Sequence, residues 1–65
     1  VVKIEIYTSP FCGFCSRAKN LLRAKGVEFR EIDVFSVAGA RDQMIERSGG
    51  RITVPQVFAD DAYLG

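Results

Sequence analysis

The sequence contains no histidine and only two cysteines. A closed structural zinc site needs four ligands, drawn mainly from these two residue types, so one chain cannot form such a site unless carboxylates contribute. A homodimer that pools four cysteines around a bridging metal stays open as an alternative. Two cysteines also fall short of the four to eight that usually staple a secreted mini-protein of this size.

Charge of one sign and long apolar runs are also missing. Nine lysines and arginines against eight acidic residues leave a net charge of +1, which argues against a nucleic-acid binder, because such proteins neutralise phosphates with a concentrated basic patch. No apolar stretch approaches the roughly 20 residues of a membrane span. The N-terminus alternates like a strand and lacks the features of a signal peptide. We therefore expect neither nucleic acid nor membrane as a partner.

What is present is one folded domain, residues 1–65, with 48% apolar residues. Periodicity and breakers predict an α/β chain in the order β-α-β-α-β-β, with the first two strands parallel. Ser36 is expected to cap the second helix, and Gly26 and Gly49 to follow the helix ends. Asp60 and Asp61 are expected to form the turn of an antiparallel hairpin. The predicted segments are strand 1–8, helix 12–25, strand 27–34, helix 37–48, strand 56–59 and strand 62–64.

The cysteines form the motif Cys12-Gly13-Phe14-Cys15 at the predicted start of the first helix. A disulfide between them would close almost no loop, so it cannot serve as a staple. Disulfide exchange needs a thiolate nucleophile and a second thiol that releases the mixed disulfide. A helix N-terminus favours a thiolate at its first residue, so we predict that Cys12 is the nucleophile and Cys15 the resolving thiol. Arg17 and Lys19 either add positive potential or simply face solvent.

Three stretches together resemble the glutaredoxin family and cover essentially the whole chain in order: residues 7–15 (YTSPFCGFC), residues 18–22 (AKNLL) and residues 53–58 (TVPQVF). The resemblance implies a thioredoxin-like fold, in which helices pack on a four-stranded mixed sheet. It further implies a glutathione-dependent thiol–disulfide oxidoreductase of the cytoplasm that reduces glutathione mixed disulfides and protein disulfides. Glutathione would be a co-substrate, and no tightly bound cofactor is expected.

The resemblance also assigns glutathione-binding residues. Thr53, Val54 and Pro55 match the loop of the family that carries a cis proline, and the Val54 backbone would pair with the cysteinyl backbone of glutathione as an added strand. Phe14 matches an aromatic residue that flanks the bound peptide. Gly65 matches the first residue of the loop that grips the γ-glutamyl end.

Three departures from the family pattern open alternatives. The centre carries Gly13 and Phe14, as in the branch whose second cysteine is serine, so a dimer that binds a [2Fe–2S] cluster through Cys12 and glutathione is the alternative function. Ser9 stands where many members carry a lysine. The chain stops at Gly65, so we expect a C-terminally incomplete domain without the final helix, and a bare apolar face that favours a homodimer, a domain swap or an unstable fragment. Reduction by thioredoxin reductase is a third possibility.

Overall fold

The structure, a computed structural model, describes residues 2–65. It confirms the predicted order β-α-β-α-β-β. Each strand and helix is shorter than its predicted segment or equal to it, because the ends of the apolar patterns fall in turns. The elements are β1 (Ile4–Thr8), α1 (Gly13–Ala24), β2 (Phe29–Asp33), α2 (Ala40–Arg47), β3 (Gln56–Ala59) and β4 (Ala62–Tyr63).

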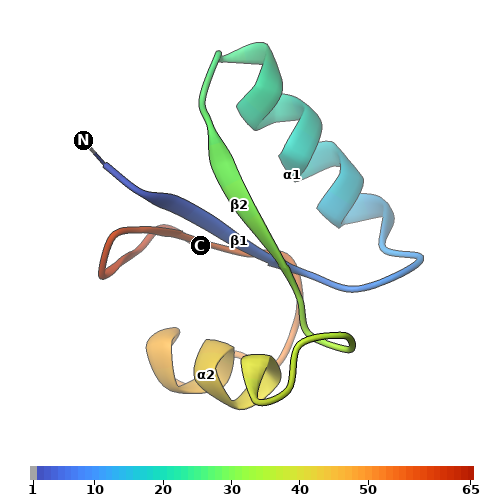
Figure 1. Ribbon diagram of the computed structural model, residues 1–65, viewed down its shortest axis with the longest axis vertical. Coiled ribbons are helices and arrows are strands. Elements are labelled where there is room, and N and C mark those ends of the chain that lie inside the picture. Colours follow the sequence, from blue (N-terminus) through green and yellow to red (C-terminus); the bar gives the residue numbers. More distant parts are fainter. Residues whose placement is uncertain (1) are drawn as a thin grey trace.

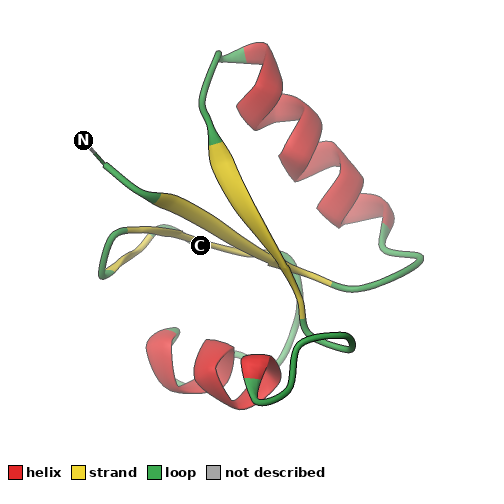
Figure 2. Cartoon of the chain, in the orientation of Figure 1, coloured by secondary structure: helices red, strands yellow, loops and turns green. Residues whose placement is uncertain are grey.

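The strands form one mixed sheet in the order β2-β1-β3-β4 (Figure 2). Strand β1 runs parallel to β2 and antiparallel to β3, and β3 pairs with β4 through the predicted hairpin. Tyr7 is opposite Gln56 in the register of β1 and β3. The segment that precedes β3 therefore lies at the same end of the sheet as the segment that follows β1 and leads to Cys12.

The two helices cover opposite faces of the sheet (Figure 1). Successive residues of a strand point to opposite faces, and α1 contacts Glu31 while α2 contacts Glu5 and Phe58, which lie on the other face. The main core lies on the α2 side, where the rings of Tyr7 and Phe58 meet edge to face at 5.5 Å. Its members are Tyr7, Ile32, Ala40, Met44 and Phe58.

The α1 side of the sheet is thinner. Ile6 and Cys15 are buried there, but Leu21 of α1 is 58% exposed and Leu64, opposite Val57 by the hairpin register, is 60% exposed. Apolar side chains are thus exposed on the α1 side of the sheet. Association through this face stays a prediction.

Neither helix within residues 2–65 is long and apolar enough to cross a membrane.

The predicted helix ends are right at three of four positions, and the start of α2 is wrong. Gly26 follows α1 at φ 69°, a left-handed conformation that suits glycine, and Val27 N–H bonds the Leu22 carbonyl at 3.0 Å. Ser36 does not cap α2, whose N-cap is Gly39. The reason is Asp33, whose carboxylate accepts the Phe35 and Ser36 N–H groups and holds these residues in a turn.

Candidate active site

Cys12 occupies the N-cap position of α1, which begins at Gly13. Its backbone is extended (φ −103°, ψ 106°), and its sulfur accepts the backbone N–H of Cys15 at 3.2 Å. This is the bond that a serine or aspartate oxygen usually makes at an N-cap. The sulfur is therefore placed where unpaired N–H groups and the helix dipole favour an anion.

The environments of the two thiols push their pKa values apart. The hydrogen bond from the Cys15 side chain lowers the pKa of Cys12 below its ordinary value, and the backbone N–H groups of Cys15 and Phe14 and the charge of Lys19 lower it further. Burial, followed by the hydrogen bond to Cys12, raises the pKa of Cys15 to about 11. Both thiols are free, and Cys15 is only 2% exposed. Of the two thiols, Cys12 is thus the one whose surroundings favour the thiolate, and its role as the nucleophile stays a prediction.

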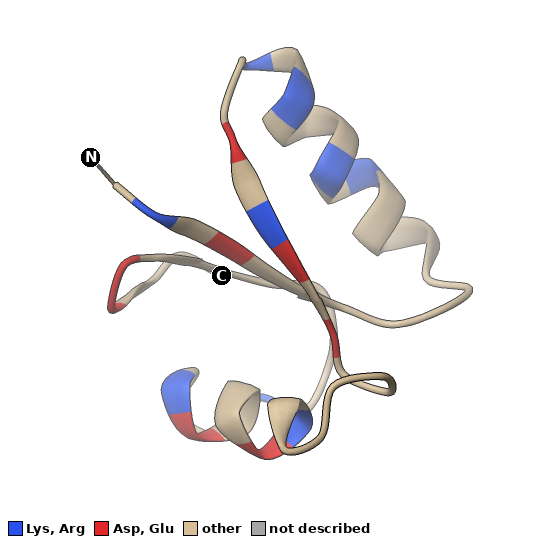
Figure 3. Cartoon of the chain, in the orientation of Figure 1, with Lys and Arg blue, Asp and Glu red and all other residues tan. Residues whose placement is uncertain are grey.

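Lys19 is a cation whose charge acts on both cysteines, and it is not simply a solvent-facing charge. Its Nζ lies 2.9 Å from the Glu31 carboxylate, which also accepts the hydroxyl of Thr8 at 2.8 Å. The two hydrogen bonds, Lys19 first, lower the pKa of Glu31. The charge of Lys19 makes the smallest contribution to the pKa of either cysteine. Arg17 is exposed on the same helix, whose charged residues are all basic (Figure 3).

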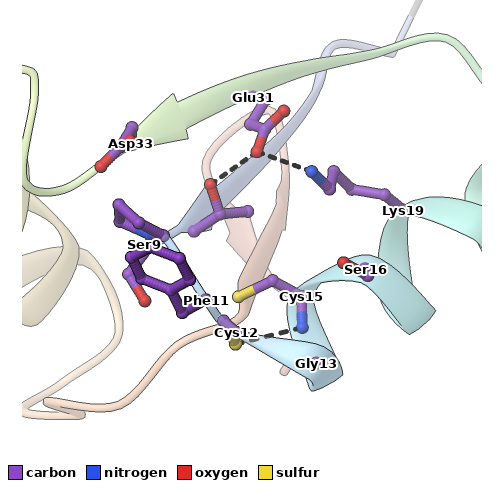
Figure 4. Close-up of a pocket in the computed structure, with 11 residues that line it drawn as sticks. Ser9, Phe11, Cys12, Gly13, Cys15, Ser16, Lys19, Glu31 and Asp33 are labelled. Carbon is purple, nitrogen blue, oxygen red and sulfur yellow. Dashed lines mark hydrogen bonds and ion pairs between the residues drawn. The ribbon is translucent and has the colours of Figure 1, made fainter.

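An open cavity of about 460 Å³ lies beside the two sulfurs (Figure 4). Polar groups of Lys19, Glu31 and Asp33 line it from α1 and β2, and Phe11 lines it from the loop before Cys12. Phe11 has φ 60°, a left-handed conformation that is rare for a bulky residue, and its side chain is fully exposed. Such conformations concentrate at functional sites.

The predicted glutathione-binding residues gather at the same end of the sheet as the cysteines. Thr53 and Val54 precede β3 there, and the Val54–Pro55 peptide is cis, as the resemblance implies. Gly65 lies beside Val57, whose N–H its carbonyl accepts at 3.0 Å. Phe14 stands exposed on the first turn of α1. None of these five residues lines the cavity beside the sulfurs.

Sequence analysis missed three residues of this region. Phe11 gave no signal, because nothing in the sequence marks a left-handed phenylalanine. Glu31 falls within the predicted strand 27–34, but its bond to Lys19 depends on the packing of α1, which the strand pattern does not indicate. Gln56 is a polar residue at a buried strand position, and that pattern was the one available signal.

The described residues 2–65 contain no group of three or more cysteine, histidine or acidic side chains that could hold a metal ion. One chain offers a single accessible sulfur, that of Cys12, so a [2Fe–2S] cluster would require a second chain and an outside thiol. The cluster alternative stays a prediction.

Comparison with known proteins agrees with this geometry. The family model described as Glutaredoxin matches residues 4–64. The chain belongs to the glutaredoxin family. It is 48% identical to Glutaredoxin 3 of Escherichia coli (strain K12) over 65 residues, which are all of this chain and 77% of that protein. As a glutaredoxin, the chain is a thiol oxidoreductase.

Solved structures confirm the thioredoxin-like fold. The solution structure of glutaredoxin from Brucella melitensis superposes with a TM-score of 0.79 at 48% identity, covering 98% of this chain and 68% of that one. The thioredoxin-like protein BC3987 superposes with a TM-score of 0.85 at 32% identity, covering 97% of this chain and 85% of that one. The glutaredoxin fold in this chain is therefore supported by sequence and by shape.

Proposed function

We propose that this glutaredoxin is a glutathione-dependent thiol–disulfide oxidoreductase that reduces glutathione mixed disulfides and protein disulfides. The observation that carries the proposal is the asymmetry of the two sulfurs. Cys12 is accessible at the start of α1 with a lowered pKa, and Cys15 is buried with a raised pKa. A nucleophile and a resolving thiol need this division of properties.

With a glutathionylated protein, the Cys12 thiolate attacks the glutathione sulfur. The bond between glutathione and the protein breaks, the protein leaves as a thiolate that takes up a proton, and Cys12 forms a mixed disulfide with glutathione. The thiolate of a second glutathione then attacks the glutathione sulfur of this mixed disulfide. Oxidised glutathione leaves, and the Cys12 thiolate is regenerated, so Cys15 is not needed on this route.

With a protein disulfide, Cys12 attacks one substrate sulfur and forms a mixed disulfide. Cys15 must then lose its proton and attack the Cys12 sulfur, which releases the second substrate thiol and leaves a Cys12–Cys15 disulfide. Two of the causes that raise the pKa of Cys15, its hydrogen bond to Cys12 and the Cys12 charge, disappear once Cys12 is in a mixed disulfide. Two glutathione molecules then reduce the disulfide and leave as oxidised glutathione.

The loop before β3 supplies support for glutathione as the co-substrate. Among residues 2–65, no hydrogen bond engages the backbone N–H or carbonyl of Val54. A peptide backbone such as that of glutathione can pair with both groups as an added strand. We assign Thr53, Val54 and Pro55 to this contact, Phe14 to the side of the bound peptide, and Gly65 to its γ-glutamyl end. A glutathione pool held reduced, as in the cytoplasm, would drive the cycle.

The test is glutathione-coupled reduction of a glutathionylated peptide, with Cys12→Ser and Cys15→Ser as variants. We expect Cys12→Ser to abolish turnover. Cys15→Ser should keep peptide turnover and lose most of the reduction of a protein disulfide. Activity that depends on Cys15 but not on Cys12 would reverse the assigned roles. A folded wild-type chain that is reduced by thioredoxin reductase and not by glutathione would overturn the choice of co-substrate.

A further inference from the structure

Gln56 is a buried polar residue at the first position of β3, with 4% of its surface exposed. Its side chain joins two segments of the chain. The Tyr63 hydroxyl of β4 donates to Gln56 Oε1 at 2.5 Å, and Gln56 Nε2 donates to the Thr53 carbonyl at 2.9 Å and to the Thr53 hydroxyl at 3.3 Å. The amide thus bridges the terminal hairpin and the loop that carries Val54.

The direction of this amide is fixed by its partners. A buried amide group is costly unless its hydrogen bonds are made. The Thr53 carbonyl can only accept a hydrogen bond, so the nitrogen of Gln56 must face Thr53. The oxygen of Gln56 then faces Tyr63, whose hydroxyl can donate. The Thr53 carbonyl thus sets the orientation of the amide, and the Tyr63 hydroxyl, which can donate or accept, adds a second contact in that orientation.

The Thr53 carbonyl, which accepts the hydrogen bond from Gln56, belongs to the same peptide group as the Val54 N–H. A peptide group is planar, and in its trans form the N–H points away from the carbonyl; of the described peptide bonds only Val54–Pro55 is cis. Fixing the Thr53 carbonyl therefore fixes the direction of the Val54 N–H. A hydrogen bond to a carbonyl also polarises its peptide group and strengthens the N–H as a donor.

We infer that Gln56 is a positioning residue, which aims the Val54 N–H at the backbone carbonyl of the bound glutathione, and that the Tyr63 hydroxyl helps to hold the Gln56 side chain in place. The inference rests on the proposed function for the identity of the ligand. Gln56 acts through Thr53 and not on the reacting sulfurs, so it serves binding of glutathione and not the rate of exchange at Cys12.

The experiment compares Gln56→Met, which keeps the length of the side chain and removes both polar groups, with Tyr63→Phe, which removes only the hydroxyl. Gln43→Met is the matched control, because Gln43 also accepts a tyrosine hydroxyl, that of Tyr7 at 2.8 Å, but does so from α2 and not beside the loop before β3. For Gln56→Met we expect KM for a glutathionylated peptide to rise about tenfold, which corresponds to one net hydrogen bond, while kcat changes less than about twofold. Tyr63→Phe should shift KM in the same direction by about threefold. The KM and kcat of Gln43→Met should stay at the wild-type level. The rate of Cys12 alkylation by iodoacetamide should stay at the wild-type level in all three variants.

A second measurement separates this inference from the proposed function. Backbone order parameters from NMR should fall at Thr53 and Val54 in Gln56→Met and stay constant at Cys12 and Cys15. Unchanged order parameters and KM would overturn the inference. Parallel changes in KM, kcat and Cys12 alkylation would also overturn it, because they indicate general loss of structure. If the wild-type chain does not turn over the peptide, the proposed function fails, and the order parameters alone decide whether Gln56 holds Val54.

Discussion

The backbone N–H of Cys15 donates to the sulfur of Cys12 at 3.2 Å. The side chain of Cys15 is also the largest cause of the lowered pKa of Cys12. On the proposed mechanism, Cys15, the resolving thiol, therefore also stabilises the Cys12 thiolate before the reaction begins. The backbone part of this contact survives any substitution at position 15 other than proline, and the side-chain part does not.

This division predicts how the pKa of Cys12 responds to variants. Cys15→Ala removes the side-chain donor and should raise the pKa of Cys12. Cys15→Ser keeps a donor at the same place and should raise it less. The measurement is the pH dependence of alkylation by iodoacetamide. Equal values in the two variants would mean that the backbone N–H groups and the helix, and not the side chain, set the pKa.

Burial of Cys15 predicts a pH dependence of stability. A thiol whose pKa is raised on folding contributes stability that is full below its unfolded pKa, about 8.5, and is lost as the pH rises toward the folded value of about 11. We compare Cys12→Ser with Cys12→Ser/Cys15→Ser by urea unfolding, so that all other titrating groups cancel and burial, the largest cause of the raised pKa of Cys15, acts without the Cys12 charge. The free energy of unfolding of the single variant should fall relative to the double variant above pH 8.5. A constant difference would show that Cys15 is not desolvated.

Substitution of Arg47 should lower the free energy of unfolding more strongly than the loss of a surface charge. Its guanidinium lies 4.2 Å from the centre of the Phe58 ring, 3.1 Å from the Glu5 carboxylate and 2.9 Å from the Tyr7 hydroxyl. Arg47→Met leaves the poorly exposed Glu5 carboxylate without its partner and should lower the free energy of unfolding by about 2–3 kcal/mol. Adding Glu5→Gln should recover about 1 kcal/mol of this loss. No recovery in urea unfolding would show that ring stacking, and not the ion pair, dominates.

Substitutions at Phe11 and Phe58 should affect the stability of the fold differently. Phe11 is exposed and left-handed, so Phe11→Gly removes a backbone strain of about 1 kcal/mol and adds a similar entropic cost, with little net change. Phe11→Val, with a branched Cβ, should destabilise by about 1 kcal/mol. Phe58 is fully buried, and Phe58→Leu should destabilise by about 1–2 kcal/mol. If thermal melts show that Phe11→Gly loses as much stability as Phe58→Leu, then the Phe11 side chain packs against the protein.

The fold follows from local patterns, which is why sequence analysis predicted it well. Alternation in β1, helical spacing in α1 and the glycine after α1 are signals within single elements, and they predict the order of elements and the position of Cys12 at the start of α1. Residues that act between elements gave weaker signals. The bonds of Arg47 to β1 and of Gln56 to Thr53 depend on which elements become neighbours. The start of α2 was missed because Asp33 competes with Ser36 for the preceding turn.

The burial of Cys15 also sets the order of chemical events in time. A reagent in solution meets the sulfur of Cys12, while Cys15, at 2% exposure, is reached from within the protein through Cys12. Oxidants and electrophiles should therefore modify one sulfur per chain, and the second sulfur reacts only after the first has acquired a partner. On the proposed mechanism, Cys12 therefore reacts first and Cys15 second without a conformational change, because the packing around the Cys15 thiol sets this order.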